Sequence, residues 1–149
     1  MAIEIDVSLH DGQFEVWNAP QRFKLIAAGR RWGKTWLGSA LCLNVALRGG
    51  RAWWIAPTYR VANVGWRGLN EMRNQIDKHI EIERRIVDRA LLFANGGEVW
   101  VKSADNPDGL RGDGLNLAVL DECAYMKEEA WSTAPVSYTH LTLPTILLV

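Results

Sequence analysis

The stretch LIAAGRRWGKTWLG at residues 25–38 decides the fold. An apolar run ends at residue 28, Gly-Lys-Thr follows at 33–35, and an apolar segment resumes behind it. A buried strand that runs into Gly-Lys-Thr and then into a helix is the setting of a phosphate-binding loop. The first N–H groups of the helix have no partner within it and face the phosphates. Such loops are usually lined by small residues, so the two arginines and the tryptophan at 30–32 need their own explanation.

The centre of this loop predicts a role for each of its residues in holding a nucleotide. Gly33 lets the backbone approach the phosphates, and Lys34 bridges the β- and γ-phosphates. The Thr35 hydroxyl is expected to hold Mg²⁺. Ala28 stands where the motif usually begins with Gly, and with Gly29 after it this side chain is small enough for that position.

The bulky residues of the loop are expected to point in different directions. Arg30 can place its guanidinium beside the γ-phosphate, because guanidinium groups pair well with phosphate. Arg31 is expected to face solvent or DNA. Trp32 is too large to line the phosphates, so we expect it to pack outward against a neighbouring element.

A phosphate loop needs a second element, an apolar strand that delivers a carboxylate to the metal. The run LAVLDE at 117–122 supplies it and places Asp121 at the carboxyl edge of the sheet, where ligands bind. We expect Asp121 to orient Mg²⁺ and Glu122 to polarise the water that attacks the γ-phosphate. The sequence contains no Asn-Lys-x-Asp guanine motif, which favours ATP hydrolysis over a signalling GTPase.

The order of predicted elements is that of an α/β fold with a mostly parallel sheet flanked by helices. They are a short helix at 12–18, a strand at 22–28, a helix at 34–47, a strand at 51–57, a helix capped by Thr58, a hairpin at 89–104 around residues 95–97, a strand at 115–120 and a helix at 127–134.

Composition bounds the function without deciding it. The 149 residues carry no net charge, yet residues 17–73 contain ten basic residues and one acidic residue. This bias fits either a solvated face or a surface that meets phosphates. Cys42 and Cys123 lack metal-ligand spacing and are expected to be reduced core residues of a cytosolic protein. Neither a signal peptide nor a membrane span is indicated.

Four stretches together resemble the ATPase domain of tailed-phage terminase large subunits, over residues 9 to about 134. They are LHDGQFEVW at 9–17, RFKLIAAGRRWGKT at 22–35, AWWIAPTYR at 52–60 and GLRGDGLNLAVLDECAYM at 109–126. The resemblance implies an ASCE-type P-loop NTPase that uses ATP and Mg²⁺ to drive double-stranded DNA into a prohead. It also implies a ring homo-oligomer in the host cytoplasm, with the terminase small subunit and the portal as partners and with a nuclease domain after the ATPase.

The resemblance also implies residue roles. It gives Gln13 a contact with adenine and Arg30 a contact with the γ-phosphate. Independently of the resemblance, Arg111 lies in a Gly-rich loop and is either an arginine finger for a neighbouring subunit or a turn residue. Tyr59 and Arg60 follow the second strand at the same sheet edge and are expected to border the nucleotide or DNA. The candidate nucleotide-binding residues are Gln13, Ala28, Gly29, Arg30, Arg31, Trp32, Gly33, Lys34 and Thr35, with Glu122, Arg30 and Lys34 as catalytic residues and Thr35 and Asp121 as metal ligands.

The end of the chain does not fit this pattern. Residues 136–149, VSYTHLTLPTILLV, resemble the translation of a transposon-based sequencing adapter, so we expect a partial ATPase domain at 1–135 and a non-native tail. On this interpretation the sheet lacks one strand and the Ser/Thr-rich coupling motif that should follow it. We therefore expect weak nucleotide binding and poor hydrolysis from this chain.

Two other functions remain open on the sequence alone. One is a helicase-like, DNA-dependent P-loop ATPase, which would carry its arginine fingers in a second domain beyond residue 134. The other is a non-catalytic assembly module that is ordered by nucleotide binding. Replacing Glu122 with Gln separates catalysis from assembly, because a catalyst would lose turnover and keep its affinity for ATP.

Overall fold

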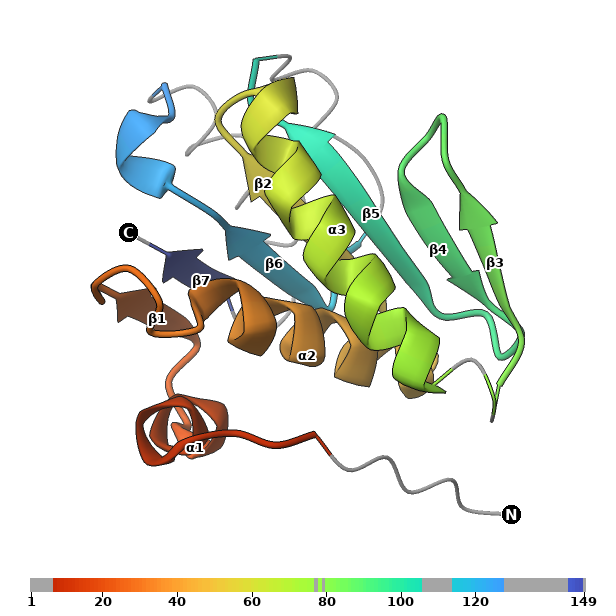
Figure 1. Ribbon diagram of the computed structural model, residues 1–149, viewed down its shortest axis with the longest axis horizontal. Helices are drawn as coiled ribbons and strands as arrows, with labels where there is room; N and C mark the ends of the chain where they lie inside the picture. Colours follow the sequence, from red (N-terminus) through yellow and green to blue (C-terminus); the bar gives the residue numbers. More distant parts are fainter. Residues whose placement is uncertain (1–6, 77, 79, 106–113, 128–144, 149) are drawn as a thin grey trace.

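The computed structural model is an α/β fold in which helices lie against a central sheet (Figure 1). It describes residues 7–76, 78, 80–105, 114–127 and 145–148. The elements in chain order are α1 (Asp11–Asn18), β1 (Phe23–Ile26), α2 (Lys34–Leu47), β2 (Arg51–Ala56), α3 (Tyr59–Ile76), β3 (Ile82–Arg85), β4 (Ala90–Phe93), β5 (Glu98–Ser103), β6 (Leu117–Leu120), a 3₁₀ turn (Cys123–Tyr125) and β7 (Thr145–Leu148).

Within the described residues the strands form one sheet of seven, in the order β1-β7-β6-β2-β5-β4-β3. The first five strands in this order are parallel, and β4 and β3 continue the sheet antiparallel. The predicted hairpin is confirmed as β4 and β5. Its turn places Gly96 in the left-handed region (φ 91°), and the Phe93 N–H donates to the Gly97 carbonyl at 2.8 Å.

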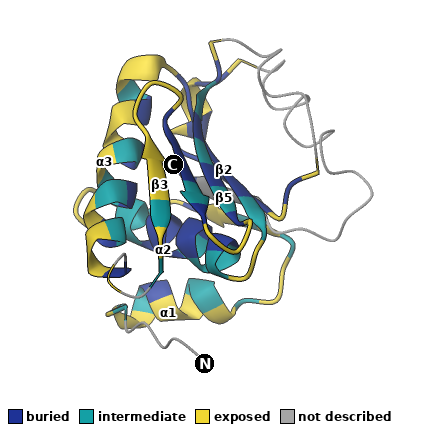
Figure 2. Cartoon of the chain, turned by 90° about the vertical axis from the view of Figure 1, so that its right-hand side faces the viewer, coloured by how far each residue is buried: buried dark blue, intermediate teal, exposed yellow. Residues whose placement is uncertain are grey.

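Two consecutive tryptophans in β2 belong to opposite faces of the sheet. Trp54 lies in the core beneath α2 and α3, where Val101 and Val119 are its partners across the strands. Trp53 belongs to a second apolar cluster, and its strand partners include Trp100. Side chains alternate along a strand, so a strand buried on both faces is apolar at nearly every position. Figure 2 shows β2 as a largely buried strand and β5 as a partly buried one, with α2 and α3 on one side of the sheet.

The indole of Trp54 fits beneath both helices because each helix presents a glycine to it. A Cβ atom added at Gly38 of α2 or at Gly65 of α3 would clash with the Trp54 ring. The two glycines therefore let α2 and α3 approach the sheet over a large aromatic side chain, which fills the space beneath both helices.

Most predicted boundaries are confirmed. The helix predicted at 34–47 spans those residues, and Thr58 caps α3 as expected, since its Oγ1 accepts from the Val61 N–H at 3.2 Å. Cys42 and Cys123 are both buried, and neither forms a disulfide within the described residues. Of the helix predicted at 127–134, all but the first residue lies outside the described residues.

Two strands differ from the prediction. The sequence did not predict β3, because its residues are mostly charged; the strand lies at the sheet edge, where such residues stay solvated. The sheet was also expected to lack a strand, but β7 pairs parallel with both β1 and β6. The run Ile-Leu-Leu at 146–148 has the apolar composition that is typical of an interior strand in a parallel sheet, whatever the origin of this segment. The non-native origin of 136–149 stays a prediction.

Candidate nucleotide-binding site

The loop between β1 and α2 has the backbone of an anion site. Gly33 caps α2 in the left-handed region (φ 94°), and Arg31 is also left-handed (φ 65°). No side chain caps the start of α2, so its first N–H groups are available to a ligand. The dipole of this 14-residue helix adds partial positive charge at the same point. This geometry suits phosphate oxygens.

Lys34 is held within this loop by main-chain oxygens. Its Nζ donates to the Ala28 carbonyl and, at 3.4 Å, to the Gly29 carbonyl. The ammonium group is thereby folded back over the loop rather than extended into solvent. Thr35, the next residue, is half-buried beside Gly68 of α3.

The two acidic residues at the end of β6 occupy different environments. Asp121 is 8% exposed, and its N–H donates to the Ile55 carbonyl of β2 at 2.8 Å. Burial, followed by repulsion from Glu122, raises the pKa of Asp121 to about 6, while the charge of Lys34 partly offsets this rise. Lys34 and Asp121, predicted from separate motifs, thus lie at the same carboxyl edge of the parallel sheet, where the charge of Lys34 lowers the pKa of Asp121. A buried carboxylate that is costly to ionise is well suited to a cation.

Glu122 is exposed and adopts a left-handed backbone (φ 47°, ψ 43°) at the start of the 3₁₀ turn. It lines a cavity of about 390 Å³ together with Thr58, Asp105 and Tyr125. This cavity lies where β2, β5 and β6 end, which is the edge where ligands of parallel sheets bind. The structure thus places the predicted catalytic carboxylate in a recess beside Asp121.

The remaining predicted residues are placed as follows. Arg30 and Arg31 are exposed in the loop. Gln13 is 4% exposed; its Nε2 donates to the Gly33 carbonyl at 2.9 Å and its Oε1 accepts from the His10 N–H at 3.0 Å. Trp32 packs against α1 as predicted, edge-on to the His10 ring. Arg111 lies outside the described residues.

Arg89 is a residue at this edge that the sequence did not reveal. Its guanidinium carbon lies 3.4 Å from the centre of the Tyr59 ring, and its Nη1 donates to the Tyr59 carbonyl at 3.0 Å. The side chain is buried although it is charged. Its signal in the sequence was weak, because a lone arginine at the start of a hairpin has no distinguishing motif. Tyr59 itself is 59% exposed beside Arg60.

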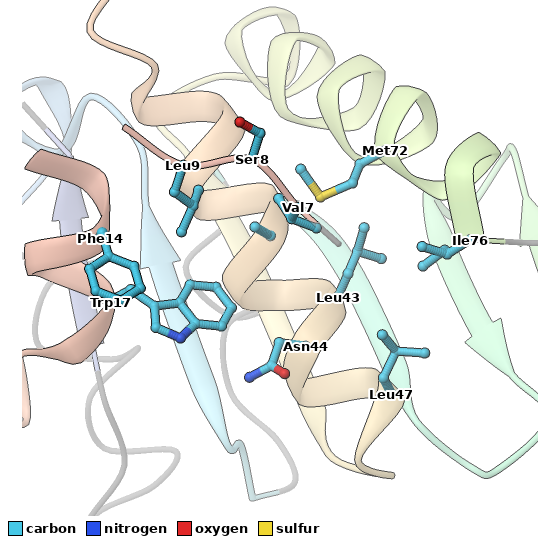
Figure 3. A pocket seen from close by; sticks show the side chains of 11 residues that line it. Val7, Ser8, Leu9, Phe14, Trp17, Leu43, Asn44, Leu47, Met72 and Ile76 are labelled. Carbon is cyan, nitrogen blue, oxygen red and sulfur yellow. The ribbon is translucent and has the colours of Figure 1, made fainter. Parts of the chain in front are cut away.

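A second cavity, of about 510 Å³, lies away from this edge (Figure 3). It is enclosed by α1, α2, α3 and the segment before α1, and it includes Phe14, Trp17, Leu43 and Met72. None of the described residues that line it is charged, so this lining does not suit a triphosphate.

The described residues also bear on metals and membranes. They contain no group of three or more His, Cys, Asp or Glu that could hold a metal by itself. A site built from Thr35 and Asp121 does not require one, because nucleotide phosphates supply further ligands. None of the helices in the described part of the chain is long and apolar enough to cross a membrane.

Comparison with known proteins decides the family. The model of the large terminase subunit, T4likevirus type, N-terminal region, matches residues 25–134. The chain belongs to this terminase family. The large terminase subunit of Thermus phage G20c is 28% identical over 144 residues, covering 84% of this chain and 30% of that protein. The chain therefore spans less than a third of that terminase.

Solved terminase structures share the fold. The large terminase ATPase domain of Thermus phage P74-26 superposes with a TM-score of 0.82 at 24% identity, covering 95% of this chain and 64% of that one. The large terminase of the thermophilic bacteriophage D6E, in complex with ADP, gives a TM-score of 0.71 at 15% identity, covering 93% and 38%. The predicted α/β class and the terminase resemblance are thus confirmed.

Proposed function

We propose that this chain is the ATP-hydrolysing motor region of a terminase large subunit, which drives double-stranded DNA into a viral prohead. The observation that carries the proposal is that the loop with Lys34 follows β1 and Asp121 follows β6, so both residues lie at the carboxyl edge of the same parallel sheet. The ADP complex of the D6E terminase supports nucleotide binding at this fold. The chain's own residues fit ATP with Mg²⁺, which would neutralise charge that develops on the phosphates.

Each residue would contribute one interaction. Lys34 would exchange its bonds to loop carbonyls for phosphate oxygens, and Thr35 and Asp121 would hold the cation. Glu122 would accept a proton from the water as that water attacks the γ-phosphate. Arg30 would pair with the γ-phosphate from within the loop. An adenine contact by Gln13 would require its amide to leave Gly33 and His10.

The wider assembly is part of the same proposal. The chain would act in the host cytoplasm within a ring of terminase subunits, with Arg111 reaching a neighbour's nucleotide and with the small subunit and the portal as partners. The exposed arginines 60 and 67 on α3 are candidates for DNA phosphates. The helicase-like and assembly-module alternatives are less favoured, because the matched family is that of packaging terminases.

Nucleotide binding and turnover of three variants test the proposal. Lys34→Ala should weaken the binding of a fluorescent ATP analogue about 30-fold in the presence of Mg²⁺. Glu122→Gln should keep that binding and lose any hydrolysis. Lys24→Ala, which removes an α1–β1 hydrogen bond to the Val16 carbonyl, is the matched control and should behave as wild type. Unchanged hydrolysis in Glu122→Gln would contradict the catalytic assignment.

A further inference from the structure

The residues just before and within the first turn of α1 contact the phosphate loop at two points and the first turn of α2 at one. The Trp36 Nε1–H donates to the Ser8 carbonyl at 3.0 Å. His10 Nε2 lies 2.7 Å from the Trp32 carbonyl, and the amide of Gln13 donates to the Gly33 carbonyl. Figure 3 shows Ser8 and Leu9 lying along α2, beside α1. A segment some twenty residues upstream in sequence thus touches both the loop and the start of α2.

The hydrogen bonds of His10 define its tautomer. A carbonyl oxygen can only accept, so Nε2 carries the proton that is donated to the Trp32 carbonyl. Nδ1 is then the acceptor for the Gln13 N–H at 3.3 Å, which is one half of a capping box at the start of α1. One neutral imidazole therefore caps α1 and holds the phosphate loop at the same time.

The indole of Trp32 completes the contact. Its ring lies 4.9 Å from the His10 ring, at 85° to it. Gly12 leaves room for this pair, since a Cβ there would come within 3.2 Å of both rings. This explains why a phosphate loop carries a tryptophan. The indole contacts the start of α1, and its two sequence neighbours, Arg31 and Gly33, are the left-handed residues of the loop.

We propose that His10 is a positioning residue for the phosphate loop, acting through the carbonyl and the ring of Trp32. Its benefit to nucleotide affinity rests on the proposed function, whereas its effect on the order of the loop does not. The residue touches no nucleotide in this arrangement. It acts by restricting the loop backbone to the conformation in which the first N–H groups of α2 face a ligand.

The test compares His10→Asn with Asn18→Ala. Asparagine is a good N-cap, so it keeps the bond to the Gln13 N–H, but it is too short to reach Trp32. Asn18→Ala removes a hydrogen bond to the Phe14 carbonyl at the other end of α1 and leaves the loop contacts intact. The exposed Arg30 and Arg31 provide the measurement, because trypsin cleaves after both.

Without nucleotide, His10→Asn should be cleaved after Arg30 and Arg31 about fivefold faster than wild type, as expected for the loss of one hydrogen bond. Its Kd for ATP should rise by about the same factor. Asn18→Ala should change neither value by more than about twofold. Cleavage after Arg22, between α1 and β1, should stay unchanged in both variants.

Two results would overturn the inference. One is loop cleavage in His10→Asn at the wild-type rate. The other is cleavage after Arg22 that accelerates equally, since this would indicate unfolding of α1 rather than release of the loop. A wild-type chain that binds no ATP but shows the expected difference in cleavage would contradict the proposed function and leave the role of His10 standing.

Discussion

Trp54 and Asp121 are both buried, one within β2 and the other just beyond β6, yet they occupy opposite kinds of surroundings. Trp54 lies among apolar groups, beneath two glycines that make room for its ring. Burial disfavours the charged form of the Asp121 carboxyl group and raises its pKa, and the next residue, Glu122, has a left-handed backbone. Burial of Trp54 contributes stability, whereas burial of the Asp121 carboxylate costs stability, as expected for a residue of the proposed ligand site. Substitutions in the two regions should therefore have opposite consequences.

Trp54→Ala should produce the largest effect. Removing this indole leaves a cavity beneath both α2 and α3, which should lower the free energy of unfolding by about 4 kcal/mol. Urea denaturation followed by circular dichroism measures this loss. Trp53→Ala, on the other sheet face, is the comparison. An equal or smaller loss at Trp54 would contradict the central role of this side chain.

Asp121→Asn should have the opposite sign. The pKa of Asp121 is about 6 in the folded chain and 3.8 for an unperturbed aspartate. The folded state therefore loses stability as the pH rises from the lower value to the higher, because the buried carboxyl group must ionise. At pH 8 the substitution should raise the free energy of unfolding by roughly 3 kcal/mol, and near pH 4 the gain should vanish. Nucleotide binding with Mg²⁺ should be lost. Equal stability of the two chains at pH 8 would show that Asp121 is not penalised by burial.

Lys34→Ala should affect binding without a matching effect on stability. Loss of a charge-assisted contact to phosphate should weaken ATP binding by about 2 kcal/mol, or roughly 30-fold. The free energy of unfolding should change by less than about 1 kcal/mol. Isothermal calorimetry and urea denaturation on the same sample measure both values. A loss of stability as large as that of Trp54→Ala would contradict this prediction and would show that Lys34 is needed for folding.

Gln13→Ala should have the smallest effect and separates two roles of one residue. If Gln13 holds the loop, ATP and GTP should both bind about fivefold more weakly, because the lost hydrogen bond is to Gly33. If it contacts adenine instead, ATP alone should lose affinity. The ratio of the two Kd values therefore decides between these roles.

The sequence predicted those parts of the fold and site that depend on local pattern. The boundaries of α2 follow from Gly33 and from the two glycines after residue 48, and Asp121 follows from the apolar strand before it. β3 was missed because its residues are charged, and Arg89 because no motif surrounds it. The hydrogen bond between His10 and the Trp32 carbonyl joins residues 22 positions apart, and no local sequence pattern predicts such a contact.

The shared position of Trp54 has a mechanical consequence for a motor. α2 begins at the phosphate loop, and α3 begins at Tyr59, on the edge that carries Glu122. The Trp54 indole packs against both Gly38 of α2 and Gly65 of α3. A tilt of either helix toward the sheet would therefore press the indole against the other helix. In the proposed motor we therefore expect α2 and α3 to move together, so that a displacement at the phosphates would reach the exposed arginines of α3.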